Sequence, residues 1–142
     1  MEGDKEKQVS KKVISNKLIT YLPAARERRG LAFSLITNNS MIEGVKIKPV
    51  KKYCDDRGFF AEIIKEGEDS FHPVKQTSYT ETHPGVIKAF HWHKRQWDVW
   101  FVVGGMAQVV LYDTREDSVT KGEIQVIYAG ADNPVLISIP PF

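Results

Sequence analysis

The sequence predicts an all-β domain in which short antiparallel strands close into a sandwich or barrel. Runs rich in Val, Ile, Thr, Tyr, Phe and Trp recur from residue 41 onward, turn signals separate them by about 8–12 residues, and no pattern among them is long enough for a helix of three turns. A length of 142 residues allows one domain with one hydrophobic core. The hydrophobic fraction of 42% and the charged fraction of 27% exclude a collagen-like or wholly disordered chain.

The expected strands follow one another through the second part of the chain. They span residues 45–50, 59–64, 74–81, 86–93, 97–103, 107–112, 123–128 and 135–139. Turn-forming residues stand between them, as in 55–58 and 83–85. We expect Gly104-Gly105 to form a tight hairpin turn, because no helix follows that would make it a phosphate loop.

Residues 1–40 differ in character from the rest. Apolar residues recur at helix-like spacing between lysines from Val9 to Ile19, which predicts one short amphipathic helix, and Pro23 and the charged run 26–29 interrupt it. We therefore expect an N-terminal extension over 1–40, partly helical or disordered, followed by a β domain over 41–142. A solvated leader is the main expectation for the extension, and an arm that contacts a partner subunit is the alternative.

Charge and cysteine content exclude several classes of partner and environment. The net charge of +2 comes from residues 1–40, which hold 8 basic and 4 acidic side chains against 12 and 14 in the remainder, so we expect no nucleic-acid partner. The one cysteine, Cys54, can form no intrachain disulfide, which favours a reducing compartment. No apolar run approaches the roughly 18 residues of a membrane span, and the first residues are acidic, unlike a secretory signal. We expect a cytoplasmic protein with no membrane contact.

The densest group of chemically versatile residues is His91-Trp92-His93, with Asp98 shortly after it. Alternate residues of a strand point to the same side, so we expect both imidazoles to project together into the space that the sheet encloses. Two imidazoles and a carboxylate can hold a divalent metal ion, and a single imidazole can instead act as a general base near neutral pH. The residues alone leave both uses open.

Ordered motifs then point to a known family. The spacing of Gly85, His91, His93, Asp98 and Gly105 resembles the first sequence motif of the cupins, with Asp98 where cupins usually carry glutamate. Residues 43–141 resemble the nucleotide-sugar epimerases of the dTDP-4-dehydrorhamnose 3,5-epimerase type. The matching segments are Asp56-Arg57-Gly58-Phe59-Phe60-Ala61-Glu62, Gln76, Gly85-Val86-Ile87-Lys88-Ala89-Phe90-His91, Asp113-Thr114-Arg115, residues 117–122 and Ile139-Pro140-Pro141. This resemblance implies a cupin-type jelly roll, or double-stranded β-helix.

The resemblance also implies a reaction and its residues. His91 would abstract the proton at C3 or C5 beside the C4 ketone of a dTDP-4-keto-6-deoxyhexose, and a cation near the ketone oxygen would stabilise the enolate. Lys88 stands where the family has an arginine, and Arg57, Glu62 and Gln76 fall at positions that bind the nucleotide. The expected partner is a nucleotide sugar of polysaccharide biosynthesis, the expected assembly is a homodimer, and no cofactor is expected.

The sequence departs from the family in three places. His93 replaces a glutamine, and Gln96-Trp97-Asp98 stands where the family has a lysine shortly after the catalytic histidine. The sequence also stops at Phe142, before the family's segment with a second histidine and a tyrosine that acts as the acid on the opposite face. We therefore expect a C-terminally truncated jelly roll with reduced activity. Two alternatives stay open: a metal-dependent cupin that uses His91, His93 and Asp98, and a non-catalytic module that binds a sugar nucleotide or a partner subunit.

Overall fold

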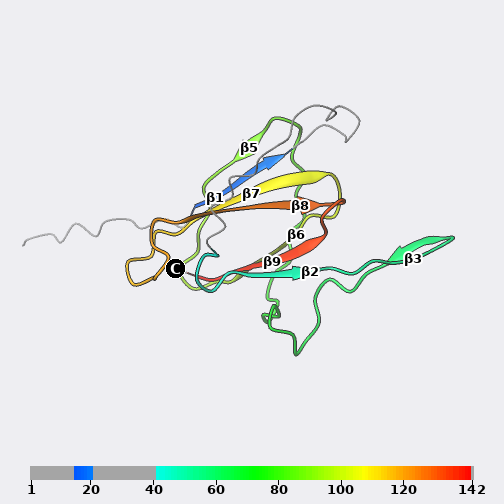
Figure 1. Ribbon diagram of the computed structural model, residues 1–142, viewed down its shortest axis with the longest axis horizontal. Helices are drawn as coiled ribbons and strands as arrows, with labels where there is room; N and C mark the ends of the chain where they lie inside the picture. Colours follow the sequence, from blue (N-terminus) through cyan, green and yellow to red (C-terminus); the bar gives the residue numbers. More distant parts are fainter. Residues whose placement is uncertain (1–14, 21–40, 142) are drawn as a thin grey trace, which may run out of the picture.

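The computed structural model describes residues 15–20 and 41–141, where the regular elements are antiparallel strands, most of them in two facing sheets (Figure 1). The first sheet has the order β5-β1-β7-β8 and the second the order β2-β9-β6. Strands β3 and β4 form a separate hairpin. The bounds are β1 Ser15–Thr20, β2 Lys46–Pro49, β3 Tyr53–Asp55, β4 Gly58–Phe60, β5 Ile87–Lys88, β6 Asp98–Phe101, β7 Met106–Tyr112, β8 Ile124–Gly130 and β9 Val135–Ile139.

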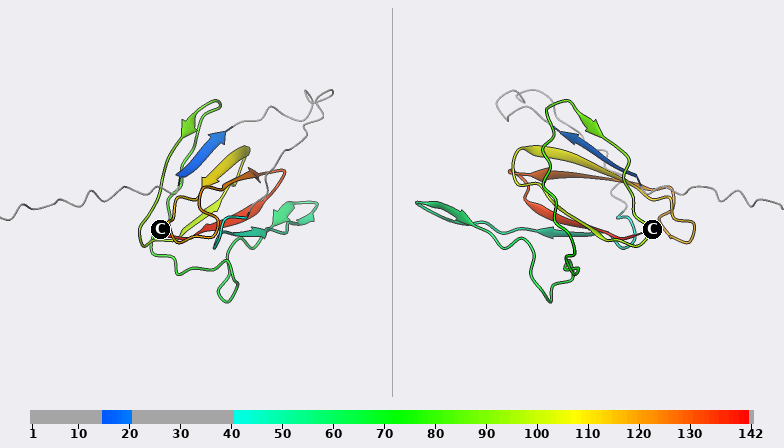
Figure 2. Two further views of the ribbon diagram at one scale, coloured as in Figure 1. Left: turned by 60° about the vertical axis from the view of Figure 1, so that its left-hand side comes forward. Right: turned by 180° about the vertical axis from the view of Figure 1, so that it is seen from behind.

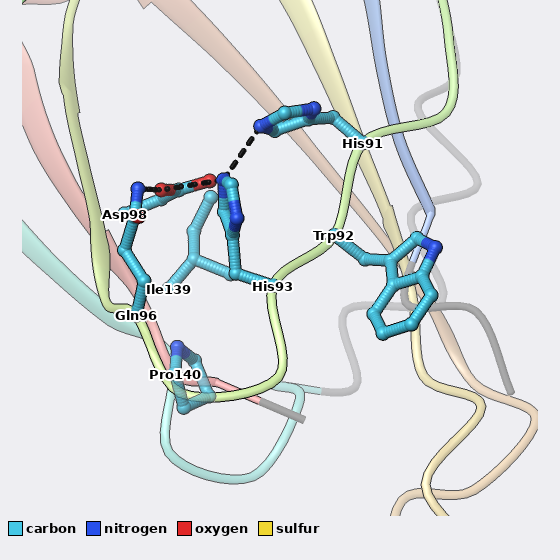
Figure 3. Close-up of a pocket in the computed structure, with 7 residues that line it drawn as sticks. All are labelled: His91, Trp92, His93, Gln96, Asp98, Ile139 and Pro140. Carbon is cyan, nitrogen blue, oxygen red and sulfur yellow. Dashed lines mark hydrogen bonds and ion pairs between the residues drawn. The ribbon is translucent and has the colours of Figure 1, made fainter.

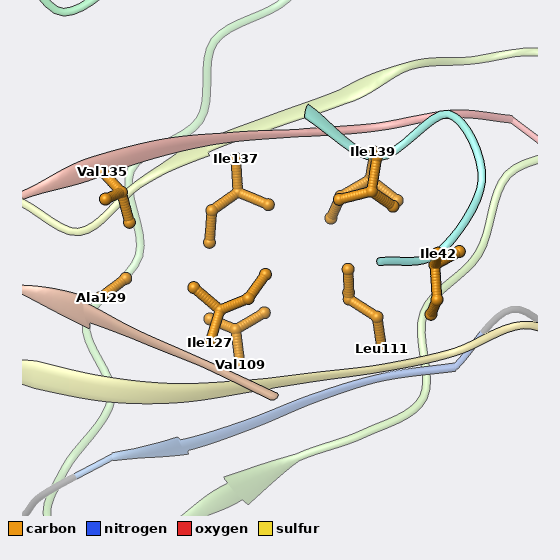
Figure 4. Close-up of a cluster of buried hydrophobic side chains, with 9 residues drawn as sticks. Ile42, Val109, Leu111, Ile127, Ala129, Val135, Ile137 and Ile139 are labelled. Carbon is orange, nitrogen blue, oxygen red and sulfur yellow. The ribbon is translucent and has the colours of Figure 1, made fainter. Parts of the chain in front are cut away.

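The core lies between the two sheets and follows from strand alternation. In β7, Ala107, Val109 and Leu111 are buried, whereas the residues between them face outward. Every residue of β9 is buried, because this strand lies at the centre of its sheet, between β2 and β6. Isoleucine and valine side chains from both sheets meet between the layers (Figure 4). This packing fixes β6, whose first residue belongs to the candidate site.

The chain passes between the two sheets at two adjacent connections. Strand β6 pairs with β9 and β7 pairs with β1 and β8, so Gly104-Gly105 links the two sheets and the predicted hairpin turn there is wrong. The connection from β8 to β9 lies beside it, since the Ala131 amide donates to the Gly105 carbonyl at 2.9 Å. Gly130 has a φ of 151° and leaves no room for a side chain: an added Cβ would lie 2.1 Å from the Gly105 oxygen.

Most of the expected strands are present, several of them with shorter or shifted ends. The expected strand 135–139 matches β9, and the strands expected at 45–50, 97–103, 107–112 and 123–128 correspond to β2, β6, β7 and β8. No strand forms at 74–81, and the strand expected at 86–93 is reduced to β5. The helix expected from Val9 to Ile19 is wrong over residues 15–19, which lie in β1 and pair with β7, and its first part lies outside the described residues. Part of the predicted extension is thus a strand of the β domain.

The β3–β4 hairpin projects away from the two sheets (Figures 1 and 2). Its turn is the predicted Asp55-Asp56-Arg57-Gly58 segment, in which Asp55 pairs with Gly58. Tyr53, Phe59 and Phe60 are more than half exposed along it. Within the described residues, no helix has the length and apolar character of a membrane span.

Candidate functional site

Two histidines and an aspartate meet in a small pocket at one end of the sheets. Its lining residues are His91, Trp92, His93, Gln96, Asp98, Ile139 and Pro140 (Figure 3). His91 and His93 lie in an extended segment between β5 and β6, and the intervening Trp92 side chain points away from both imidazoles. The sequence prediction that the two imidazoles share one side is confirmed, although the segment around them is not a regular strand.

The ligand-type atoms of these three residues converge on one point. The Nε2 atoms of His91 and His93 lie 2.6 Å apart, and the rings meet edge to face at 83°. The same Nε2 of His93 lies 3.5 Å from Asp98 Oδ1. All three donor atoms are within 4.8 Å of one another. The group can therefore share a proton or surround an ion.

Asp98 is the fixed member of the group. It opens β6 opposite Ile139 of the buried strand β9, and only 11% of its side chain is exposed. The Gln96 amide donates to its Oδ1 at 3.0 Å. His93 is 28% exposed and His91 is exposed, so accessibility rises from the carboxylate to the outer imidazole. A solute that enters the pocket reaches His91 first.

Behind the pocket, a buried polar network holds the wall in place. Asp113 is fully buried and accepts hydrogen bonds from Arg115 at 2.8–3.0 Å, from Ser118 at 2.5 Å and from Thr120 at 2.7 Å. Burial raises the pKa of Asp113, but these hydrogen bonds outweigh it, and the pKa lies well below its ordinary value. Arg115 also donates to the Glu43 carbonyl at 2.6 Å.

The network reaches the pocket through a turn. Residue 43 is followed by Gly44, whose φ is 80°, and a Cβ added there would lie 3.2 Å from Pro140 Cγ. Pro140 lines the pocket. Asp113 and Arg115 belong to a segment that resembles the epimerase family, and here they have a structural role. They position the turn that packs on Pro140.

Trp97, which directly precedes Asp98 in the chain, stacks on His72. The ring centroids are 3.7 Å apart and the planes are 15° from parallel. Burial and the nearby Lys46 ammonium lower the pKa of His72, so the ring is neutral near pH 7. The loop that carries it is held by hydrogen bonds from Lys46 to the Asp69 carbonyl and from Ser138 to the Ser70 carbonyl.

The other predicted site residues lie outside the pocket. Lys88 donates to Thr80 Oγ1 at 2.8 Å and to the Glu81 carbonyl at 2.9 Å. Gln76 donates to Ser78 at 3.3 Å in an exposed loop, and Glu62 is exposed beyond the hairpin.

Arg57 is also distant from the pocket lining and occupies the hairpin turn. It binds both oxygens of Asp55, and these hydrogen bonds lower the pKa of that carboxyl group. Arg57 and Asp55 therefore form an ion pair within the hairpin turn. The turn itself favours this contact, because the Arg57 amide also donates to Asp55 Oδ1 at 2.9 Å.

Sequence reasoning missed three contributors to the site. It did not predict the hydrogen bond from Gln96 to Asp98, the position of Pro140 in the pocket wall or the stacking of His72 on Trp97. The two-residue spacing of Gln96 and Asp98 is a signal that could have predicted their contact. The other two join segments far apart in the chain, for which spacing gives no signal.

Comparisons with known proteins give relatives in polysaccharide and glycan biosynthesis. The spore coat polysaccharide biosynthesis protein SpsL of Bacillus subtilis (strain 168) is 56% identical over 100 residues, which are 70% of this chain and 66% of that protein. The probable low-salt glycan biosynthesis epimerase Agl13 of Haloferax volcanii is 34% identical over 101 residues, which are 70% of this chain and 65% of that protein. The chain thus spans just under two thirds of the length of these relatives.

A solved structure agrees with the fold. The crystal structure of a dTDP sugar isomerase from Desulfovibrio desulfuricans G20 matches with a TM-score of 0.66 and 28% identity, over 70% of this chain and 64% of that one. The fold is an all-β jelly roll of the cupin type, as the sequence predicts. A family model described as the polysaccharide biosynthesis C-terminal domain matches residues 53–142, which is more than half of the chain. The chain belongs to this family of polysaccharide biosynthesis C-terminal domains.

Proposed function

We propose that this protein acts on a nucleotide sugar in polysaccharide biosynthesis, as an isomerase that moves a proton beside a ketone. The observation that carries the proposal is the exposed imidazole of His91 in a pocket with His93 and Asp98. The Agl13 and dTDP sugar isomerase likenesses support the class of reaction. The substrate proposed here is a dTDP-4-keto-6-deoxyhexose, and the reaction is epimerisation at C3 and C5.

In this reaction His91 is the general base. The lone pair of Nδ1, the ring nitrogen that does not face His93, takes the proton from C3 or C5, the electron pair of the broken C–H bond forms the enolate double bond, and the charge moves to the C4 oxygen. Return of a proton to the opposite face of the same carbon completes the inversion. His93, hydrogen-bonded to His91, and Asp98 beside it stabilise the imidazolium that forms.

Lys88 is the proposed cation for the enolate oxygen or the diphosphate. Its ammonium binds a hydroxyl group and a backbone carbonyl, which are neutral acceptors, so its charge is available to an anionic substrate. A lysine offers a point charge where an arginine would offer a planar fork. We expect weaker diphosphate binding than an arginine at this position would give.

The proposed nucleotide-binding residues are Arg57, Glu62 and Gln76, and we propose that the protein acts as a homodimer. The hairpin that carries Arg57 projects from the sheets and contributes no residue to the pocket lining of its own chain. A second copy would bring such a hairpin to the pocket and cover its exposed aromatic rings. We place the reaction in the cytoplasm, where the exposed Cys54 thiol remains reduced.

Deuterium exchange tests the proposal. The protein is incubated in heavy water with a dTDP-4-keto-6-deoxyhexose, and deuterium at C3 and C5 is followed by NMR. We expect His91-dependent incorporation of deuterium beside the ketone, because removal of the proton by the base is the step that exchanges it with solvent, and a general base contributes about 10²–10⁴-fold to that step. Incorporation no faster than with His91→Asn would overturn the isomerase proposal and leave a binding module.

A further inference from the structure

We propose that His91, His93 and Asp98 form a binding site for a divalent first-row transition metal ion, of the kind represented by Zn²⁺ or Co²⁺. The proposed isomerase reaction needs no metal, so this site goes beyond it. The argument rests on which atoms face one another, on the chemistry of the three donors and on how Asp98 is held.

The arrangement of atoms favours an ion over a proton relay. A carboxylate–imidazole–imidazole relay uses the two opposite nitrogens of the central ring, one for each neighbour. Here a single atom, His93 Nε2, faces both His91 Nε2 at 2.6 Å and Asp98 Oδ1 at 3.5 Å. Donor atoms that point to one centre are arranged as ligands are around a cation.

The distances are close to those that an ion requires. Metal–nitrogen and metal–oxygen bonds are about 2.0–2.2 Å, which places neighbouring ligand atoms about 3.0–3.4 Å apart. The three donor atoms lie within 4.8 Å of one another. The two Nε2 atoms, now 2.6 Å apart, have to separate by less than about 1 Å to reach the spacing of two ligands on one ion. His91 is exposed, so its ring can turn to make this adjustment without displacing the core.

The donor set selects the class of ion. Two imidazole nitrogens and one carboxylate suit zinc, cobalt, nickel and iron, whereas Mg²⁺ and Ca²⁺ prefer oxygen donors alone. The pocket opening beside His91 leaves further coordination positions to water or to a ligand oxygen. The site is therefore expected to bind Co²⁺ and Zn²⁺ and to discriminate against Mg²⁺.

Asp98 has the features of an oriented metal ligand. Its carboxylate is largely buried, it is fixed by β6 pairing with β9, and the Gln96 amide donates to it at 3.0 Å. Among the described residues it forms an ion pair with a histidine and with no lysine or arginine. A bound cation would supply the positive charge that this carboxylate lacks.

Metal binding and the proposed base role compete, a consequence that rests on the proposed function. An ion at this site takes the Nε2 lone pair of His91, which moves the ring proton to Nδ1 and removes the lone pair that would accept the substrate proton. The metal would therefore lower deuterium exchange in proportion to its occupancy. The binding itself is independent of whether any exchange occurs.

The test measures binding directly on the full chain without a histidine tag. The protein is freed of metal with a chelator, dialysed, and titrated with Co²⁺ and with Zn²⁺ by calorimetry, while Co²⁺ binding is also followed by its visible absorption. We expect one ion per chain and at least 10-fold weaker binding of Mg²⁺. His93→Gln and Asp98→Asn should each weaken Co²⁺ binding on the order of 10–100-fold or more. His83→Gln, an exposed histidine outside the cluster, is the matched control and should bind as the parent does.

Two results would overturn the site. One is the absence of saturable Co²⁺ binding by the parent chain, and the other is equal binding by the parent, His93→Gln and Asp98→Asn. Circular dichroism of both variants verifies that they fold, and because they change different residues, one folded variant is sufficient for the comparison. Failure of metal binding with retained deuterium exchange would reject this site alone, and metal binding without exchange would reject the isomerase proposal alone.

Discussion

His91 and His93 place their Nε2 atoms 2.6 Å apart, a separation at which one imidazole donates a hydrogen bond and the other accepts it. Because His91 is the more exposed of the two, it is the ring that a substrate meets, and His93 lies between it and Asp98. The two histidines thus have different surroundings despite their two-residue spacing, and substitutions should separate their roles.

We expect His91→Asn to abolish deuterium exchange and His93→Gln to lower it by less than 10-fold. Asparagine offers no lone pair of suitable basicity, whereas loss of a general base costs about 10²–10⁴-fold in rate. The amide oxygen of a glutamine at position 93 can still accept a hydrogen bond from His91 Nε2–H. Exchange rates in heavy water, measured by NMR at equal protein concentration, check this difference. Equal losses in the two variants would contradict the assignment of His91 as the base.

We expect the protein to be a homodimer that dissociates when the hairpin loses its apolar surface. Phe59 and Phe60 are 62% and 65% exposed, and burial of such side chains contributes about 1.5–3 kcal/mol each. Light scattering at tens of micromolar should give twice the chain mass for the parent and a smaller mass for Phe59→Ser with Phe60→Ser. A matched control is Val119→Ser, which changes another highly exposed apolar residue. A monodisperse monomer of the parent chain would contradict the proposed assembly.

We expect Asp113→Asn to lower the free energy of unfolding by about 3 kcal/mol at pH 7. The substitution removes the charge from a fully buried carboxylate and leaves Arg115, whose side chain is 18% exposed, without its ionic partner. Asp117→Asn changes an exposed aspartate in the same loop and should have little effect. Urea unfolding of the three proteins measures the differences. An equal stability of parent and Asp113→Asn would show that the network does not hold the loop.

The difference in the free energy of unfolding between the parent and Asp113→Asn should depend on pH. The pKa of Asp113 in the folded protein lies below its ordinary value of 3.8, so its contribution to stability is fully present above that value and is lost as the pH falls below about 4. The stability advantage of the parent over Asp113→Asn should therefore be constant above about pH 5 and shrink as the pH falls from about 4 to about 2, below the unfolded-state pKa. Urea midpoints across this range provide the measurement, and a constant difference would contradict the role of the charge.

Local patterning predicts the strands well where burial is strictly alternating or complete. Strand β9 is found where a run that is apolar except for Ser138 predicts it, and β7 is found where a mostly apolar run predicts it, with burial that alternates along the strand. The segment 74–81 has the composition of a strand but forms none, because no neighbouring strand pairs with it among the described residues. Strand formation requires a hydrogen-bonding partner, which composition cannot reveal.

The candidate site was predictable to the extent that its residues are neighbours in sequence. His91, His93 and Asp98 were found from their spacing, and the structure brings them together. Arg57 and Lys88 were assigned through resemblance, and each binds a local partner outside the pocket. The contacts of His72 with Trp97 and of Gly44 with Pro140 depend on how distant segments pack, for which the sequence carries no short-range signal.

Gly130→Ala should unfold the domain or lower its free energy of unfolding by about 3 kcal/mol or more, because the β6–β7 and β8–β9 connections pack closely at this residue. A Cβ at this position would lie 2.1 Å from the Gly105 carbonyl oxygen and 2.9 Å from Met106 Cα, and the φ of 151° is itself strained for alanine. Both contacts are with backbone atoms, so no side-chain rotation relieves them. Gly104→Ala is the matched control in the facing connection, because a Cβ there meets nothing within 4 Å. Thermal and urea unfolding of the two variants should differ accordingly, and a Gly130→Ala protein as stable as Gly104→Ala would mean that the two connections do not approach each other in this way.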